Sequence, residues 1–190
     1  MKPSLLLASQ SPRRRKILKF IGVDFRVVKP LGVVEKRKRG EPPRDLVRRL
    51  AQEKARSVSA KFPGHFVLGA DTVVFSCGRI FGKPQNRRQA AAMLMRLQGG
   101  PHEVWTGVAL AVPGDKRIRT RVEKTKVYFK PFSLKSIADY LNSAEPYDKA
   151  GAYNIEGTGR TWVHKWEGDY FNIVGLPVRT VLEMLKNLNL

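Results

Sequence analysis

The chain has few of the residues on which several classes of protein depend. Its single cysteine, Cys77, excludes an internal disulfide framework and a cysteine-rich zinc site, and it fits a reducing cytoplasm. No apolar run approaches the roughly 18 residues that a membrane-spanning helix requires. Residues 1–8 lack the cleavage pattern of a signal peptide, and the arginines follow this apolar stretch instead of preceding it. These absences predict a cytoplasmic protein that makes no use of a membrane.

Histidines and phosphate-binding loops are equally sparse. His65, His102 and His164 show no i, i+4 pair and no other metal-ligand spacing. Residues 78–84 resemble a Walker A loop only superficially, because the spacing is one residue short and Pro84 stands where a serine or threonine is required. The sequence therefore argues against a histidine metal pair and against a P-loop nucleotide site.

Acidic residues are scarce beside basic ones. The chain has 36 Lys and Arg against 16 Asp and Glu, and residues 1–60 alone hold 17 basic and 5 acidic residues. Such an excess attracts polyanions, either nucleotides or nucleic acid. The densest run, residues 36–39, is short, and a short charge run is more typical of a solvated loop than of a binding site. Charge alone leaves both kinds of partner open.

The length of 190 residues and a hydrophobic content of 42% predict one folded domain over residues 1–190. Hydrophobic periodicity and turn residues then predict the elements. Helices are expected at 12–20, 44–60, 86–97 and 133–142 and from Pro177 onward, the last with Val181, Leu182 and Leu185 inward. Strands are expected at 5–8, 25–28, 66–75, 103–112, 117–129, 153–155 and 160–166. This alternation predicts an α/β protein with a mixed, twisted sheet.

The junction between the first strand and the first helix is a candidate anion site. Ser11 and Pro12 suit the start of a helix, whose free N–H groups and dipole favour an anion at this junction. Arg13 and Arg14 in the first turn are unfavourable for a plain helix. They fit either a bound anion or, as the alternative, side chains that point into water or pair with a distant carboxylate.

Four further charged residues are candidates for a functional site. Asp71 interrupts an apolar strand, so it is a catalytic candidate or a structural aspartate satisfied by backbone N–H groups. Lys54 falls on or beside the apolar stripe of the second helix, where a lysine needs a partner or a ligand. Glu35, at the edge of the basic loop, is an upstream acid that could help to hold a hard cation such as Mg²⁺, and Lys83 could supply a charge to phosphate.

Taken in order, these motifs resemble those of the Maf family of nucleoside triphosphate pyrophosphatases. The matching segments are 7–14 (LASQSPRR), 50–55 (LAQEKA), 68–73 (LGADTV), 82–84 (GKP), 148–153 (DKAGAY) and 168–177 (GDYFNIVGLP). They cover the chain from residue 7 to residue 177, and their order is as specific as their composition.

The resemblance implies a Maf- and ITPase-like α/β fold, in which a long mixed sheet flanked by helices forms two lobes around a deep cleft. It also implies a cytoplasmic homodimer that hydrolyses a nucleoside triphosphate between the α and β phosphates, with Mg²⁺ or Mn²⁺. Asp71 then matches the catalytic carboxylate, and Glu35 and Asp71 match the metal region. The residues that match the family's phosphate-handling positions are Ser9, Arg13, Arg14, Lys54 and Lys83.

Base preference depends on three positions in this family. Relatives that act on dTTP and UTP typically carry arginine, threonine and glutamine, whereas this chain has Arg13, Thr72 and Glu156. Glutamate at the third position is more typical of relatives that prefer 7-methyl-GTP. A carboxylate only accepts hydrogen bonds, whereas a glutamine amide also donates. Two positions of three predict dTTP and UTP, and 7-methyl-GTP or another modified nucleotide is the alternative.

Two other points stay open. Val34 stands where many relatives carry another acid, so metal binding is expected to be weaker or differently arranged. The rival class is a basic nucleic-acid-binding or cell-division regulatory protein that uses residues 36–39. No zinc finger, RNA-binding aromatic signature or heptad supports it, so nucleic acid is expected to bind only non-specifically, through the basic surface.

Overall fold

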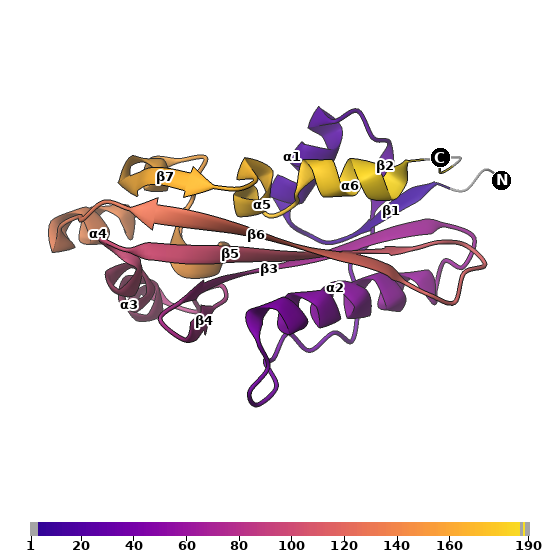
Figure 1. Ribbon diagram of the computed structural model, residues 1–190, viewed down its shortest axis with the longest axis horizontal. Helices are drawn as coiled ribbons and strands as arrows, with labels where there is room; N and C mark the ends of the chain where they lie inside the picture. Colours follow the sequence, from indigo (N-terminus) through magenta and orange to yellow (C-terminus); the bar gives the residue numbers. More distant parts are fainter. Residues whose placement is uncertain (1–3, 187, 189–190) are drawn as a thin grey trace. The chain divides into compact units, whose positions relative to one another are not determined.

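The computed structural model describes residues 4–186 and residue 188 (Figure 1). Within these residues one sheet of seven strands has the order β2-β1-β3-β5-β6-β7, and β4 pairs with β3. The strands are β1 (Leu5–Ala8), β2 (Phe25–Val27), β3 (Phe66–Ser76), β4 (Arg79–Phe81), β5 (Pro101–Ala111), β6 (Arg119–Phe129) and β7 (Val163–Glu167). The helices are α1 (Pro12–Phe20), α2 (Pro43–Ser59), α3 (Arg87–Leu97), α4 (Leu134–Tyr140), α5 (Tyr170–Val174) and α6 (Val178–Leu185), with 3-10 turns η1 (Ala150–Ala152) and η2 (Thr158–Trp162).

The sheet is mixed, as predicted. β1 runs parallel to β2 and to β3, whereas β4 is antiparallel to β3 and β7 is antiparallel to β6. β1 is wholly buried, and each of its residues is apolar. Such continuous apolar strands are typical of sheets that are covered on both faces. The predicted α/β class with a mixed sheet flanked by helices is therefore confirmed.

The chain divides into two compact units. Unit 1 takes the described residues of Met1–Asp71, Thr106–Glu123 and Gly175–Leu190, and unit 2 takes Thr72–Trp105 and Lys124–Val174. The division passes through β3 between Asp71 and Thr72, and also through β5 and β6. The predicted single domain over residues 1–190 and the predicted cleft between two lobes both stay predictions.

Unit 1 is built by the close approach of α2 to the sheet. Figure 1 shows α2 along one face and α1 and α6 on the other. Gly69 of β3 makes the approach possible, because a Cβ there would lie 2.7 Å from the backbone nitrogen of Ala55. Gly107 of β5 has the same role opposite the backbone of Val47. The helix buries its predicted apolar stripe in this contact, and with it the side chain of Lys54.

Unit 2 has an aromatic core. The ring of Phe129 contacts those of His102, Tyr153 and Trp162 edge to face, at centroid distances of 4.6, 4.9 and 6.4 Å. Such contacts add to the burial of apolar area. The segment that carries Tyr153 turns sharply, because Gly151 and Ala152 have φ values of 71° and 60°. Glycine is required at position 151 because its φ is positive and because a Cβ there would lie 2.9 Å from Val74 Cγ2.

Four details of the predicted elements are corrected. The predicted strand at 153–155 is wrong, since that segment is irregular and is fixed by the turn at Gly151. The predicted strand at 160–166 begins only at Val163, because residues 158–162 form η2. Leu182 was predicted to face inward on α6, but it is 47% exposed, and Met184 is buried. The sequence prediction also missed the short hairpin strand β4.

Candidate active site

The centre of the candidate site is an ammonium group between two carboxylates. Lys54 Nζ lies 2.6 Å from Asp71 Oδ1 and 2.6 Å from Glu35 Oε1. Lys54 and Asp71 are buried, whereas the side chain of Glu35 is 57% exposed. The sequence predicted all three residues, and the structure brings them together in unit 1. The group therefore reaches from the core of the sheet to solvent through Glu35.

The fold explains why this buried charge cluster forms. Asp71 is the last residue of unit 1 on β3, two residues after Gly69, where α2 packs against the strand. Lys54 projects from the buried face of α2, and its ammonium contacts Asp71 of β3 and Glu35 of the loop before the helix. A buried lysine or aspartate is tolerated when it is paired. The structure thus selects the ion pair with Lys54 over backbone N–H groups as the partner of Asp71.

The environment of Asp71 changes its acidity. Burial raises the pKa of the Asp71 carboxyl, since the charged form is poorly solvated there. The ion pair and hydrogen bond with Lys54, and the charge of Arg14, act in the opposite direction, and the nearby Glu35 adds to the increase. A carboxyl whose pKa is raised by its surroundings is typical of residues that exchange protons in catalysis.

Arg14 fixes the backbone beside this cluster. Its Nη1 donates to the carbonyl oxygen of Ala70 at 2.8 Å and to Ser9 Oγ at 3.2 Å, and its Nε donates to the carbonyl of Gly175 at 2.9 Å. Burial lowers the pKa of Arg14, and the Asp71 carboxylate partly offsets this effect. The guanidinium therefore joins the start of α1, the residue before Asp71 and the segment that leads to α6.

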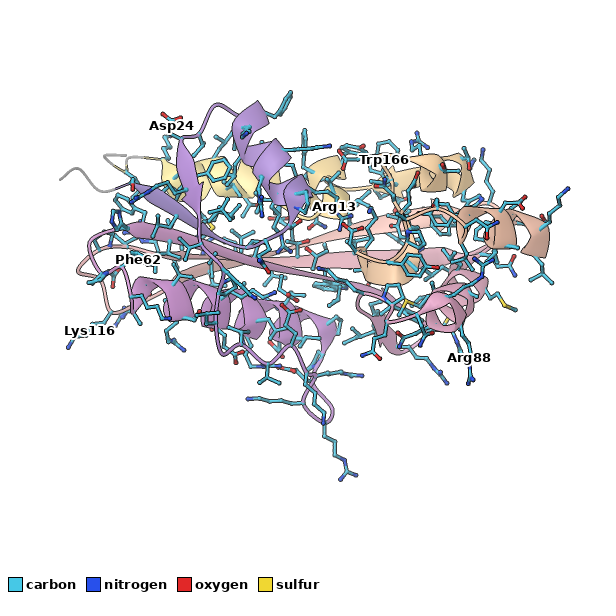
Figure 2. All side chains as sticks on the ribbon, turned by 180° about the vertical axis from the view of Figure 1, so that it is seen from behind. Arg13, Asp24, Phe62, Arg88, Lys116 and Trp166 are labelled. Atoms are coloured by element: carbon cyan, nitrogen blue, oxygen red, sulfur yellow. The ribbon has the colours of Figure 1, made fainter. Side chains whose placement is uncertain are left out.

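The junction of β1 and α1 presents polar groups as the sequence predicts. Ser11 occupies the N-cap position without a side-chain cap bond, and its backbone N–H donates to Ser9 Oγ at 3.2 Å. The first turn of α1 contains no acidic residue, and Arg13 lies there half-buried (Figure 2). The positive end of the helix is thus lined by cations and hydroxyl groups, which together favour an anion.

The other predicted residues belong to unit 2. Lys83 is exposed in the loop after β4, and Thr72 is half-buried on β3. Glu156 is exposed in the segment between η1 and η2. The loop of Lys83 is held in place, because the backbone N–H of Gly151 donates to the carbonyl of Gly82 at 3.1 Å. The 82–84 and 148–153 motifs are therefore one structural feature of unit 2. Whether these residues share a site with Asp71 stays a prediction.

Three charged residues, Lys149, Arg49 and Glu41, form ion pairs that the sequence analysis did not predict. Lys149 is buried and pairs with Asp148. Arg49 and Glu41 form a bidentate ion pair next to the segment that carries Glu35. A signal for Lys149 existed in its motif, but an arginine on the polar side of a helix carries no such signal, because most of these side chains are solvated.

The acidic side chains of the site are its possible ligands for a metal ion. No group of three or more His, Cys, Asp and Glu side chains that could hold a metal occurs in residues 4–186 and 188. Glu35 and Asp71 offer two carboxylates next to one lysine. Mg²⁺ is commonly bound through one or two carboxylates together with substrate phosphates and water. The two acids have the kind of oxygen that such an ion binds, and metal binding stays a prediction.

No helix in the described part of the chain is long and apolar enough to cross a membrane. The absence of any membrane role stays a prediction. Cytoplasmic location stays a prediction.

Comparisons with known proteins identify the family. The sequence profile described as "Maf-like protein" matches residues 4–188. A dTTP/UTP pyrophosphatase of Koribacter versatilis is 46% identical over 182 residues, which are 96% of this chain and 93% of the relative. Another, of Syntrophus aciditrophicus, is 45% identical over 184 residues, 97% of this chain and 89% of the relative. The structure of the Ham1 protein of Staphylococcus aureus matches with a TM-score of 0.55, and the match covers 96% of this chain and 98% of the Ham1 chain. Because the two sequences are only 10% identical, this likeness supports the fold alone. The chain belongs to the Maf family.

Proposed function

We propose that this protein is a nucleoside triphosphate pyrophosphatase that hydrolyses the bond between the α and β phosphates and releases a nucleoside monophosphate and pyrophosphate. The observation that carries the proposal is the buried Asp71 paired with Lys54, which also contacts the half-exposed Glu35. Family membership and relatives named dTTP/UTP pyrophosphatase support the same reaction. The enzyme is a hydrolase of acid anhydrides in phosphorus-containing compounds.

We propose dTTP and UTP as the substrates. Arg13 and Thr72 agree with this preference, and so do the names of the relatives. Glu156 is the exception, because its carboxylate accepts hydrogen bonds and cannot donate to an acceptor on the base. A modified nucleotide such as 7-methyl-GTP is the alternative substrate that Glu156 favours.

In the proposed reaction a water molecule attacks the α phosphorus, and the bond from this phosphorus to the bridging oxygen breaks. The bridging oxygen leaves with its electron pair as part of pyrophosphate. Asp71 accepts the proton of the attacking water, a role that suits a carboxyl whose pKa is raised by burial. Lys54 holds this carboxylate by a bond of 2.6 Å and so fixes its orientation.

The triphosphate requires several cations, since one lysine in water gains little from a phosphate. Arg13 at the first turn of α1 is the proposed bidentate phosphate ligand, and Ser9 a hydroxyl contact. Arg14 maintains the loop geometry through its bonds to Ser9, Ala70 and Gly175. Lys83 supplies a mobile charge that offsets the charge on the leaving pyrophosphate.

A divalent ion, Mg²⁺ or Mn²⁺, is part of the proposal. Glu35 and Asp71 would hold it, and it would supply positive charge to the phosphate oxygens. This proposal rests on the hard oxygen ligands of the two acids and on the resemblance to the family. Chelation of divalent ions should accordingly abolish pyrophosphate release, and addition of Mg²⁺ or Mn²⁺ should restore it.

The test is pyrophosphate release from dTTP, UTP, CTP and 7-methyl-GTP by the native protein and by Asp71→Asn. Loss of the general base should lower turnover by about 10² to 10⁴-fold. Asp24→Asn is the matched control, because Asp24 is an exposed aspartate of the same unit (Figure 2). Full activity of Asp71→Asn would refute the assigned role.

The remaining partners are proposed at a coarser level. A homodimer is proposed from the family resemblance, and light scattering after gel filtration tests it. Non-specific nucleic-acid binding through residues 36–39 should weaken steeply as salt increases. Tight duplex binding at physiological salt together with no cleavage of any nucleotide would favour the nucleic-acid-binding alternative instead.

A further inference from the structure

The segment that carries Glu35 contains a feature that needs explanation. Residues 36–39 are four successive cations, all exposed, and they lie in a segment without regular secondary structure that leads to Glu41. Four adjacent like charges repel one another, so this segment has no reason of its own to adopt one conformation. Yet Glu35, directly before it, lies 2.6 Å from Lys54. Something must hold the chain near α2.

Arg49 of α2 is the group that holds it. Its Nε donates to Glu41 Oε1 at 2.7 Å and its Nη2 donates to Glu41 Oε2 at 2.8 Å, a bidentate contact. The same Nη2 donates to the carbonyl of Lys36 at 3.1 Å, and Nη1 donates to Glu53 Oε1 at 3.1 Å. One guanidinium thus binds the first residue of the cationic run, Glu41 two residues beyond the end of the run, and a neighbouring turn of its own helix.

Glu41 in turn orders the residues between. Its Oε2 accepts from the backbone N–H of Lys38 at 3.0 Å, and its carbonyl accepts from Arg37 Nε at 2.7 Å. The side chains of Arg49 and Glu41 are only 18% and 9% exposed, so the contact is less screened than a surface ion pair. The hydrogen bonds from Arg49 also lower the pKa of Glu41 to about 2, which keeps the carboxylate charged.

We infer that Arg49 is a positioning residue, which through Glu41 and the carbonyl of Lys36 places Glu35 against Lys54. The inference rests on the proposed function, because it assigns to this contact the task of holding Glu35 in the active site. The carbonyl of Lys36 is next to Glu35 in the chain, and Arg49 and Lys54 project from the same helix. A contact outside the candidate site thus supports the ion pair between the exposed Glu35 and Lys54.

A lysine cannot replace Arg49 in this task. Its ammonium would retain the charge opposite Glu41, but it lacks the planar fork that binds both carboxylate oxygens and the carbonyl of Lys36. Arg49→Lys should therefore preserve folding while it loosens the segment. A displacement of the order of 1 Å at a reacting group can cost about 100-fold in rate, so a loss of about tenfold in kcat/KM is expected here.

The experiment is a double-mutant cycle on pyrophosphate release with Arg49→Lys, Glu35→Gln and the double variant. If Arg49 acts through Glu35, kcat/KM falls about tenfold in the native background and less than about twofold in the Glu35→Gln background. Arg48→Lys is the matched control, because Arg48 is the neighbouring arginine of α2, is 53% exposed and pairs with Asp45 at 3.0 Å. Equal losses in both backgrounds would overturn the inference.

Hydrogen exchange of the peptide 36–41 supplies a measurement that does not depend on activity. Release of Glu41 in Arg49→Lys should remove the protection of the Lys38 amide and accelerate its exchange several-fold, about tenfold at most. Unchanged exchange would overturn the inference even if activity fell. Unaltered kcat/KM in Arg49→Lys would also overturn it while the proposed function stood. If the native protein released no pyrophosphate at all, the proposed function would fail, and the role given to Glu35 would fail with it.

Discussion

Lys54 and Asp71 form a buried ion pair, with Nζ 2.6 Å from Oδ1 and both side chains almost inaccessible to water. A pair of this kind couples stability to chemistry, because each charge depends on the other for solvation. The sequence indicated a lysine that needs a partner and an aspartate that needs a partner. The structure shows that each is the partner of the other.

Removal of one member of this pair should therefore affect folding as well as activity. Lys54→Met leaves the Asp71 carboxylate buried without its ammonium, and a loss of about 3 to 5 kcal/mol in the free energy of unfolding is expected. The double variant Lys54→Met with Asp71→Asn should recover much of this loss without recovering turnover. Urea unfolding measures the stability of the single and the double variant, and pyrophosphate release measures their turnover. A single variant as stable as the native protein would show that the pair contributes nothing to folding.

Replacement of Lys83 should lower activity without lowering stability. Its side chain is exposed in the loop after β4, so Lys83→Ala should leave the unfolding temperature unchanged. Pyrophosphate release should nevertheless weaken by about tenfold in kcat/KM, since a charge–phosphate contact contributes about 1 to 3 kcal/mol. Arg79→Ala, which removes another exposed cation of the same hairpin, serves as the control. Equal effects of the two substitutions would mean that only general charge matters.

Glu156 decides the base preference in our proposal. Glu156→Gln restores a group that can donate as well as accept, so the ratio of kcat/KM for dTTP to that for 7-methyl-GTP should increase. A change of about tenfold corresponds to one hydrogen bond gained or lost. Steady-state pyrophosphate release with both nucleotides gives the ratio. A ratio that stays constant, or moves in favour of 7-methyl-GTP, would contradict the assignment.

Gly69 provides a test of the close approach of α2. In Gly69→Ala the new Cβ would lie 2.7 Å from the backbone nitrogen of Ala55, so the helix must move away from the strand. We expect a loss of about 1 to 3 kcal/mol of stability, together with reduced turnover as Lys54 is displaced from Asp71. Gly64→Ala is the control, because nothing lies within 4 Å of a Cβ at that exposed position. Thermal unfolding and pyrophosphate release are measured for both.

The ion pair of Glu41 and Arg49 predicts a specific loss of stability in acid. The pKa of Glu41 is lowered from 4.5 to about 2, mainly by the hydrogen bonds from Arg49. A lowered carboxyl pKa stabilises the fold above the unfolded value, and this stabilisation is lost as the pH falls from about 4.5 towards 2. The difference in unfolding free energy between the native protein and Glu41→Gln should therefore shrink over this range. A difference that does not change with pH would contradict the prediction.

The parts that the sequence predicted are those where a residue conflicts with its surroundings. Asp71 in an apolar strand and Lys54 beside an apolar stripe could each be recognised, because burial of an unpaired charge is unfavourable. The strand and helix cores followed from hydrophobic periodicity. These local signals do not depend on distant parts of the chain.

The parts that the sequence did not predict depend on contacts between distant residues. Arg49 looks like an ordinary solvated arginine until the segment around Glu41 is placed beside it. Residues 153–155 have strand-like composition, but the turn at Gly151 and the rings around Tyr153 hold them in an irregular conformation. Leu182 fits the helical period of α6, yet the neighbouring Met184 is the residue that is covered. In each case tertiary packing overrides local preference.

The hydrogen bond from Arg14 to the carbonyl of Gly175 has a consequence for the order in which the protein matures. The two residues are 161 positions apart, so a ribosome must have made the chain as far as Gly175 before this bond can form. Until then the guanidinium lacks one of its acceptors, and the backbone before Asp71 is less firmly held. The backbone beside Asp71 should therefore gain this support from Arg14 only after the segment around Gly175 has been synthesised.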